Sequence, residues 1–460
     1  MSHLKHAEAK SNEGPAFGGL AWLPDPASPS RFAELKLGNY LFCFILLLLL
    51  FATNRSPDQS LIEFAGMDSY SYIAIAQAFP HLPSSALRIP FHHAQREAIP
   101  YLVGAISWLT NLSVGTCFFV VVLFLILAIV FLFARLLSEL SLPTSGINLL
   151  LLFFVLSPYT FRFYIALPFV LTDLSFQLGL VIVALGLFKQ RPWVTFSGFL
   201  LASLSRQTAL LIIPLILGWA YLVWPAAKPF GSKLRKAVFS IAVLAVGILV
   251  YKGAGKLAAE YAQPNINEAH LVGLLNWTST SFSLKELSVF LFRALVPFVI
   301  PVCFVLALVF RYSPRKWPGP ERTKVFLLLG SVILICSQPI LGGPIITGAN
   351  LPRLNNLAIV PLLIAIGVIL KWLNVEEELF DRVFPYACLF ASVGSFHHVF
   401  SYLGGSNSQR AGQFTMVSFL LGAMLFFIVL YFTGKVLPSK LESDLVELQG
   451  NRESVCAIEP

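Results

Sequence analysis

Long apolar runs without a single charged side chain recur along the sequence, among them Tyr40–Thr53, Val114–Ala134 and Ala294–Phe310. Backbone groups in hydrocarbon must find their hydrogen-bond partners within the protein, so such runs favour helices. Hydrophobic residues make up 57% of the 460 residues and charged residues 12%, whereas soluble domains average about 45–50% and about 25%. The mean hydropathy is +0.77. These properties exclude an ordinary soluble enzyme and predict an all-α polytopic membrane protein.

The apolar runs predict about twelve transmembrane helices. Their centres lie near residues 46, 126, 152, 176, 198, 215, 244, 300, 332, 362, 391 and 423. A long first outer loop, residues 55–115, carries two juxtamembrane amphipathic stretches, Met67–Phe79 and Ala98–Leu109, although the second is also compatible with a membrane span. We expect a cytoplasmic tail at 1–36, one membrane domain at 37–434 and a second cytoplasmic tail at 435–460.

Basic residues in the connecting segments indicate the orientation, because cytoplasmic loops are enriched in Lys and Arg. The net charge of +9, from 32 basic and 23 acidic residues, is explained in this way and predicts no nucleic-acid partner. Three basic clusters are interpreted as cytoplasmic: 189–191, 228–236 and 311–324. The first two share one side only if two spans separate them, so Trp193–Trp224 should be a helical hairpin with Arg206 near the opposite face. Segments 252–285 and 342–353 are then expected to be outer loops.

This orientation gathers six charged residues on the non-cytoplasmic side, mostly as solitary charges: Asp68, Arg88, Arg96, Arg162, Arg206 and Arg353. Asp68 starts an amphipathic stretch, where its carboxylate can accept a proton from an incoming hydroxyl or can cap the helix. Asp173 is expected inside an apolar span, where an ionisable group costs about 2.5–3.5 kcal/mol and usually faces a cavity or a partner. Two interpretations of Asp173 stay open: a polar group in a reaction cavity, and a structural ion pair with Arg162 or Arg206.

Two arginines are candidates for binding an anion. Arg206 lies in Ser205-Arg206-Gln207-Thr208 between two apolar halves, and its planar guanidinium can bind two phosphate oxygens at once. The alternative is that it snorkels to lipid head groups. Arg353 ends a segment rich in Gly and Pro that begins at Gly342. We expect an outer loop there, which either presents Arg353 to a ligand or is only a turn with an interfacial anchor.

Metal binding has little support in the sequence. His92 and His93 are adjacent, as are His397 and His398, but neighbouring side chains on a helix point in different directions and no carboxylate spacing resembles a ligand set. The six cysteines show no paired spacing. Neither a nucleotide-binding glycine loop nor a G-x-S-x-G motif occurs, which argues against ATP-driven transport and serine hydrolysis. We predict no metal site and no definite cofactor, with dependence on a divalent cation left open.

The order of these features resembles the C-type superfamily of integral membrane glycosyltransferases, GT-C, which use polyprenyl-phosphate-linked sugars. In that family an Asp lies in a large outer loop after the first span. The counterpart here is Asp68, which is followed by Tyr70 and Tyr72. Arg96-Glu97-Ala98-Ile99-Pro100-Tyr101-Leu102 is similar to the family's Arg-x-x-x-Pro-x-Leu start of a juxtamembrane helix. Many members have two adjacent acidic residues in this loop, whereas here Ser69 follows Asp68.

Further matches follow in the same order along roughly residues 40 to 370. Ser157-Pro158-Tyr159 resembles the Ser-Pro that ends the family's third span, and Asp173 falls where an acidic residue often recurs. Ser205-Arg206-Gln207-Thr208 is similar to a Ser/Thr-Arg-x-Thr turn of several branches, and Arg353 with Pro361 resembles a late Arg and downstream Pro. Each motif is short, so their order and the shared topology carry the resemblance.

The resemblance implies an inverting transferase that passes a sugar from a polyprenyl-phosphate donor to a glycan, lipid or protein outside the cytoplasm. Asp68 would be the catalytic base, and Asp173 would orient the base, the acceptor or an Arg. The donor phosphate would be bound by Arg96, Arg206 and Arg353. The remaining substrate contacts are predicted from Tyr70, Tyr72, Arg88, Arg162 and Gln207.

The alternative class is a multi-pass transporter or lipid flippase, which would show repeats and broken helices at matching positions in both halves. Asp68 and its elaborate outer loop occur in one half only. A non-catalytic scaffold explains the hydrophobicity but does not account for Asp68, Asp173 and Arg206 together. We expect a bacterial inner membrane, with the site facing the periplasm or exterior.

Overall fold

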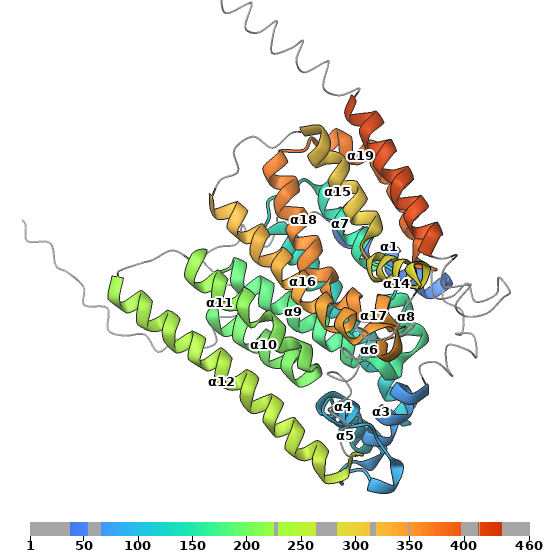
Figure 1. The fold of residues 1–460 in the computed structure, drawn as a ribbon, viewed down its shortest axis with the longest axis vertical. Coiled ribbons are helices and arrows are strands. Elements are labelled where there is room, and N and C mark those ends of the chain that lie inside the picture. Colours follow the sequence, from blue (N-terminus) through green and yellow to red (C-terminus); the bar gives the residue numbers. More distant parts are fainter. Residues whose placement is uncertain are drawn as a thin grey trace, which may run out of the picture.

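The computed structural model describes residues 37–53, 66–224, 229–263, 283–312, 319–347, 350–396, 413 and 415–434. These residues form helices joined by short turns, and no strand occurs among them (Figure 1). Both predicted tails lie outside the described residues, as do residues 54–65 and the pair His397 and His398.

The first half of the chain contains helices that begin with α1 and end with α11. They are α1 (Leu37–Thr53), α3 (Gly66–Ala78), α4 (Phe91–Ala94), α5 (Ala98–Thr110), α6 (Val114–Ser138), α7 (Thr144–Val155), α8 (Phe161–Ala166), α9 (Thr172–Phe188), α10 (Pro192–Ser205) and α11 (Ile213–Leu222). Short 3-10 turns lie between some of them: η2 (Ser85–Leu87), η3 (Pro168–Val170) and η4 (Gln207–Ile212).

The second half contains longer helices. They are α12 (Pro229–Tyr261), α14 (Leu284–Leu295), α15 (Val299–Tyr312), α16 (Gly319–Thr347), α17 (Leu351–Asn355), the 3-10 turn η6 (Asn356–Ala358), α18 (Ile359–Leu373), α19 (Glu377–Ser395) and a last helix, Thr415–Gly434.

Several helices can cross a membrane. Within the described part of the chain, five are long and apolar enough, and a sixth results if α14 and α15, bent by 77°, form one span. Each of the twelve predicted centres falls within a helix. Helices α1, α7, α9, α10 and α11 have 10–17 residues, fewer than the about 20 that a perpendicular crossing needs. The chain is therefore an all-α protein with helices suited to a membrane.

The prediction of two helices between Trp193 and Trp224 agrees with a break in the chain at Arg206. This residue is extended, with φ −155° and ψ 143°, between α10 and η4. Both α10 and α11 pack against α9 and α12. The extended backbone at Arg206 ends α10 and allows the chain to change direction next to the juxtamembrane helices.

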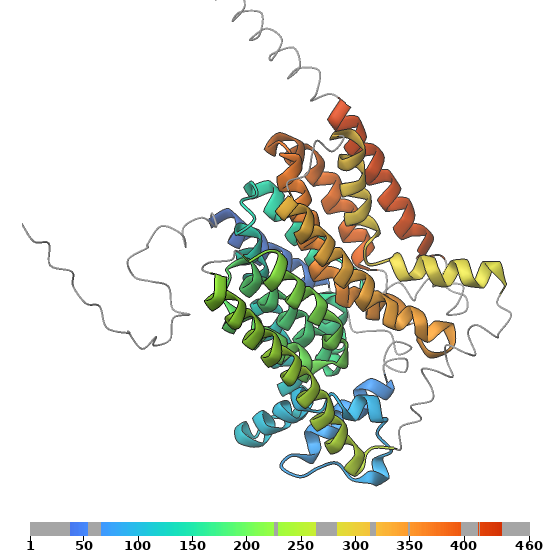
Figure 2. The same cartoon turned by 60° about the vertical axis from the view of Figure 1, so that its left-hand side comes forward.

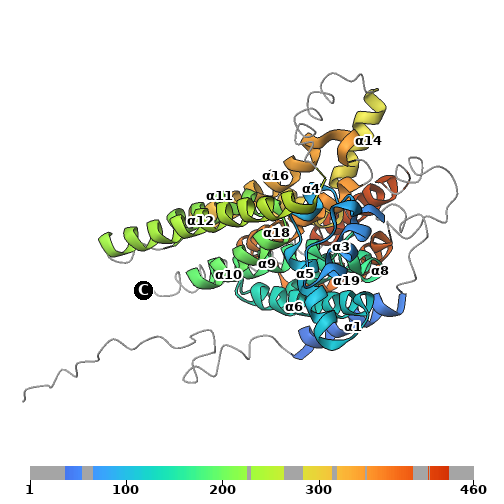
Figure 3. The same ribbon diagram turned by 90° about the horizontal axis from the view of Figure 1, so that it is seen from below.

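The predicted amphipathic stretches form α3 and α5 within one residue at each end. With α4 they lie at one end of the bundle, where α12 reaches them (Figures 1 and 3). At 13 residues α5 is too short to span a bilayer alone. The prediction that an outer loop starts at Lys252 is wrong, because α12 continues to Tyr261. The Tyr261 hydroxyl donates to Glu97 Oε2 at 2.6 Å and lies 3.3 Å from the Ala94 carbonyl oxygen.

The predicted Gly- and Pro-rich outer loop is also wrong. Helix α16 continues through Gly342, Gly343 and Pro344 to Thr347, and Arg353 lies in α17. Gly and Pro are tolerated in membrane helices when neighbouring elements satisfy the backbone groups. Near the end of α16, α14 lies across the bundle rather than along it (Figure 2). Helices α14, α16 and α17 pack against one another, and this packing positions Arg353.

Candidate functional site

Four charged side chains form a continuous ionic network: Asp68, Asp173, Arg206 and Arg353. Arg353 Nη1 donates to Asp68 Oδ2 at 2.7 Å, and Arg353 Nε donates to Asp173 Oδ2 at 2.8 Å. Arg206 Nη1 donates to the other oxygen of the same carboxylate, Asp173 Oδ1. Arg353 therefore links the two predicted catalytic carboxylates, and Asp173 links the two arginines.

The network is assembled at the ends of helices. Asp68 and Asp173 lie in the first turns of α3 and α9, where the unpaired amides and the helix dipole stabilise a negative charge. Arg206 occupies the extended break after α10, and Arg353 lies in the short helix α17. Asp173 is thus at the end of its helix and not deep within a span as predicted. Of the six charges that the sequence suggested were mostly solitary, Asp68, Arg206 and Arg353 form ion pairs.

Burial distinguishes Asp68 from the rest of the network. The side chain of Asp173 is 0% exposed, those of Arg206 and Arg353 are 4% and 3% exposed, and that of Asp68 is 18% exposed. Buried charges are stable only when they are paired and hydrogen-bonded, which explains the close pairing of the inner three. Asp68 is the most exposed member of the network.

His93 is part of the network through Asp68, although the sequence analysis named it only in arguing against a metal site. Its Nε2 lies 2.7 Å from Asp68 Oδ1, and its Nδ1 lies 3.0 Å from the Ser71 hydroxyl. Burial, together with Arg96 and Arg353, outweighs Asp68 and lowers the pKa of His93 below its usual value. A neutral His93 that donates from Nε2 to Asp68 accepts at Nδ1 from Ser71. No sequence signal separates His93 from His92, which is exposed.

The two partners of Asp68 decide its acidity. Burial alone would raise the pKa of this carboxyl, but Arg353 and His93 outweigh the effect and hold the pKa well below its usual range. Asp68 is therefore ionised at neutral pH. Its placement inside the first turn of α3, with both oxygens bonded to residues from other helices, shows that it does more than cap its own helix.

Arg96 adds a third cation beside the network. Its Nε donates to Gln207 Oε1 at 3.2 Å, and its Nη1 donates to the Tyr72 hydroxyl at 3.3 Å. Both partners are neutral, and no ion pair of Arg96 occurs among the described residues. The site contains three positive charges, on Arg96, Arg206 and Arg353, and two negative charges, on Asp68 and Asp173. It therefore has an excess of one positive charge. It is therefore suited to an anion with a single negative charge.

Tyr164 is another site residue that was not predicted. Its hydroxyl donates to Asp173 Oδ2 at 3.1 Å, and its side chain is fully buried. Tyr164 thereby supplies the third side-chain donor to the Asp173 carboxylate. The sequence offers no signal for this role, because Tyr164 lies in a segment rich in aromatic residues, a pattern that is typical of ordinary apolar packing.

Three predicted substrate contacts lie outside this cluster. Tyr70 is 54% exposed, and Arg88 is exposed at the end of η2. Arg162 donates to Thr53 Oγ1 at 3.0 Å and Ser395 Oγ at 3.3 Å, and its guanidinium lies 4.0 Å from the ring centre of Phe396. Asp173 therefore pairs with Arg206, as one interpretation held, and not with Arg162. The other two substrate contacts, Tyr72 and Gln207, do lie beside Arg96.

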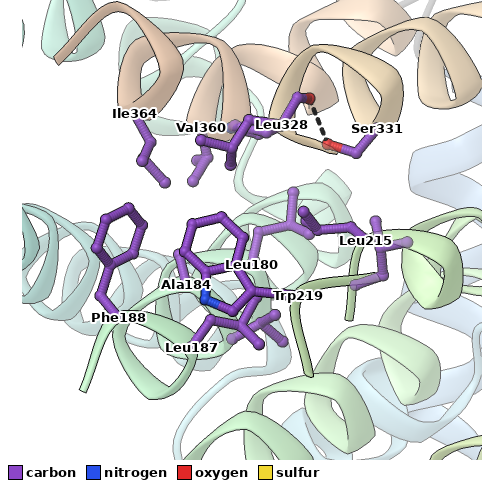
Figure 4. Close-up of a pocket in the computed structure, with 13 residues that line it drawn as sticks. Leu180, Ala184, Leu187, Phe188, Leu215, Trp219, Leu328, Ser331, Val360 and Ile364 are labelled. Carbon is purple, nitrogen blue, oxygen red and sulfur yellow. Dashed lines mark hydrogen bonds between the residues drawn. The ribbon is translucent and has the colours of Figure 1, made fainter. Parts of the chain in front are cut away.

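A small apolar cavity of about 10 Å³ lies between α9, α11, α16 and α18 (Figure 4). Pro361 lines it together with Leu180, Trp219 and Val360, and Ser331 donates its hydroxyl to the Leu328 carbonyl at 2.7 Å. No titratable side chain lines the pocket. It has room for about one water-sized group, and it offers no side chain for acid–base chemistry.

Within the described residues, no three side chains of His, Cys, Asp or Glu are grouped as a metal site requires. Comparison with known proteins gives no match to a protein family, to a curated protein or to a solved structure. The function must therefore be argued from the site itself.

Proposed function

We propose that this chain is a membrane glycosyltransferase that moves a sugar from a polyprenyl-phosphate donor to an acceptor hydroxyl outside the cytoplasm. The observation that carries the proposal is the link made by Arg353 between Asp68 and Asp173, with Arg206 on the same Asp173 carboxylate. It places a partly exposed carboxylate next to buried cations, as sugar transfer from a phosphate requires. The similarity to the GT-C order of motifs supports the same reaction.

The proposed reaction forms one bond and breaks one. The acceptor oxygen attacks the anomeric carbon and its proton passes to Asp68, while the bond between that carbon and the phosphate oxygen breaks. The phosphate leaves with the electron pair of this bond, and Arg96, Arg206 and Arg353 stabilise its charge. When the phosphate engages Arg353, Asp68 loses a cationic partner, and the resulting rise in its pKa makes it a stronger base.

The finer topology belongs to this proposal. Helices shorter than about 20 residues, such as α9 and α10, would also cross the membrane, packed against neighbouring helices. The chain would then span the membrane about twelve times. The site would face the periplasm of a bacterial inner membrane, as the basic clusters indicate.

The first test is sugar transfer by the purified protein in detergent with a panel of polyprenyl-phosphate sugars. We expect the wild type to release polyprenyl phosphate, and Asp68→Asn to reduce the rate by about 10²- to 10⁴-fold, as for loss of a general base. Asp381→Asn, an exposed position on α19, is the matched control and should keep the rate. Full activity of Asp68→Asn would refute the base assignment. Movement of substrate across vesicles without release from any donor would favour a transporter.

A further inference from the structure

Helix α14 differs from its neighbours in direction. It meets α15 at an angle of 77°, and it lies across the bundle (Figure 2). The break between the two helices contains Pro297, which has no backbone N–H with which to continue the hydrogen-bond pattern of α14. The proline therefore accounts for the change of direction at this point.

The angle prevents α14 from adding to a membrane crossing by α15. The 12 residues of α14 are about 18 Å long, but at 77° they advance only about 4 Å along the axis of α15. The hydrocarbon core of a bilayer is about 30 Å thick. If α15 crosses the membrane close to its normal, α14 runs roughly parallel to the membrane surface.

The surface of α14 has two apolar strips. Phe290 and Ala294 are 5% and 3% exposed and form a buried cluster with Leu351 of α17. The second strip, here called the open strip, has four large apolar side chains that are 44–83% exposed: Leu284, Leu291, Phe292 and Leu295. Glu286 is also exposed, and it lies about 140–180° around the helix from the three leucines. An apolar strip opposite a charged side chain is typical of helices in a membrane interface.

The open strip continues onto a helix that can span the membrane. The Phe292 ring packs edge-on against Phe419 of the last helix, Thr415–Gly434, with the ring centres 5.2 Å apart. Met416 and Leu420 share a face of this helix beside Phe419, and they are 76% and 62% exposed. Apolar surface of this kind on a membrane helix faces lipid. Because the open strip borders this surface, lipid is its expected partner.

The buried strip attaches α14 to the segment that carries Arg353. Asn355 Nδ2 donates to the Ala294 carbonyl at 2.8 Å, and Leu351 packs against the same side of α14. Leu351 and Asn355 are the two ends of α17, with Arg353 between them. The position of α14 in the membrane therefore determines the depth of Arg353.

We propose that α14 is a lipid-binding helix that lies in the membrane interface on the side of the ionic network and holds Arg353 at the level of the lipid head groups. The open strip reaches about 5–10 Å into the boundary between head groups and acyl chains, and Glu286 faces water. This position does not depend on any reaction. Its consequence for a donor phosphate at Arg353 rests on the proposed function.

Single cysteines on α14 test this position in vesicles of phosphatidylcholine and phosphatidylglycerol. Leu291→Cys and Leu295→Cys place a thiol on the open strip, and Glu286→Cys is the matched control on the opposite side of the same helix. The wild type gives the background from the native cysteines. We expect a charged, membrane-impermeant maleimide to label Glu286→Cys at least about tenfold faster, because an apolar environment disfavours the reactive thiolate. Equal labelling of all three would place the open strip in water and overturn the proposal.

A fluorophore attached to Leu295→Cys identifies what covers the open strip. Its quenching is compared between lipids that carry a nitroxide near the head group and lipids that carry it near the end of the acyl chain. We expect stronger quenching by the shallow nitroxide. Stronger quenching by the deep nitroxide would make α14 part of a broken transmembrane span. Slow maleimide labelling without quenching by either lipid would show that protein covers the strip. Each of these two results overturns the proposal.

The link to Arg353 is tested by charges on the open strip. The double substitution Leu291→Asp with Leu295→Asp opposes insertion of the strip among acyl chains. We expect the donor KM in vesicles to rise at least about tenfold, while the acceptor KM stays unchanged. Glu286→Gln, on the side that faces water, should match the wild type. An unchanged donor KM in the double variant would show that α14 does not hold Arg353.

The two proposals fail differently. If the wild type transfers sugar and the three cysteines are labelled alike, the position of α14 is wrong while the proposed function stands. If labelling and quenching agree with an interfacial α14 but no donor is used, the proposed function is wrong while the position of α14 stands.

Discussion

The charge state of Asp68 is set by two neighbouring side chains. Arg353 and His93 each bond one oxygen of its carboxylate and hold its pKa well below the usual range. In this resting arrangement Asp68 is a weak base. Base strength would therefore depend on an anion that attracts Arg353 away, so that proton transfer is coupled to donor binding. In the proposed reaction, the bond from His93 would keep the carboxylate in place during this exchange.

The buried, neutral state of His93 predicts a pH effect on stability. Burial lowers its pKa below the about 6.5 of an unfolded chain, so the unfolded state binds more protons in this range. The His93 contribution to the free energy of unfolding is complete above about pH 6.5 and decreases as the pH falls toward the folded-state pKa. We expect the Tm in detergent to fall less between pH 7 and pH 5 in His93→Gln than in the wild type.

The control for this measurement is His92→Gln, since His92 is exposed next to His93. It should keep the pH dependence of the wild type. An identical change of Tm with pH in His93→Gln and the wild type would show that His93 does not titrate as a buried, neutral imidazole.

Close packing of α9 and α10 positions two members of the ionic network, because Asp173 starts α9 and Arg206 follows α10. Glycines allow the approach: a Cβ at Gly198 would lie 2.6 Å from the Val183 nitrogen and 2.8 Å from the Gly179 carbonyl oxygen. Small residues at helix interfaces are the usual means of close packing in membranes. The separation of the two helices therefore determines whether Arg206 reaches Asp173.

Gly198→Leu should force α9 and α10 apart. Overpacking costs about 1–3 kcal/mol in well-packed cores, and here the obstacle is backbone. We expect a lower Tm in detergent and loss of transfer activity. Gly330→Leu on α16, where a Cβ would meet nothing within 4 Å, should leave both unchanged. Equal effects of the two substitutions would contradict the packing argument.

Across the whole molecule, the ionic network connects segments from residue 68 to residue 353. It joins α3 at the end of the bundle to α9, α17 and the break after α10. Buried ion pairs contribute little net stability when they are intact, but removal of one partner leaves an uncompensated charge that costs about 3–5 kcal/mol. The network thus links the juxtamembrane helix α3 directly to the helical bundle.

A double-mutant cycle tests the coupling between Asp173 and Arg206 within this network. Asp173→Asn should lower the free energy of unfolding strongly, because Arg206 and Arg353 then lose a buried partner. Arg206→Gln should do so less. Because Arg206 is already unpaired in Asp173→Asn, the double mutant should be less destabilised than the sum of the single mutants. Thermal unfolding in detergent measures all four proteins, and additive effects would show that the pair is not coupled.

Much of the helix map follows from the amino-acid pattern alone. Apolar runs predicted a helix at each of twelve positions, and the stretches 67–79 and 98–109 match α3 and α5 closely. These predictions succeed because helix formation depends on residues that are near one another in the chain. Pattern reasoning failed at Gly342–Pro344 and Lys252, where contacts with other helices extend α16 and α12 beyond the expected ends.

Membrane character, the helix positions and the candidate status of Asp68, Asp173, Arg206 and Arg353 follow from composition and local pattern. Only the tertiary structure decides which charged side chains form pairs. Arg353 reaches Asp68 across 285 positions of sequence, His93 rather than His92 faces the carboxylate, and Arg162 pairs elsewhere. The physical reason is that side-chain pairing depends on how whole helices pack, and no short-range periodicity encodes that arrangement.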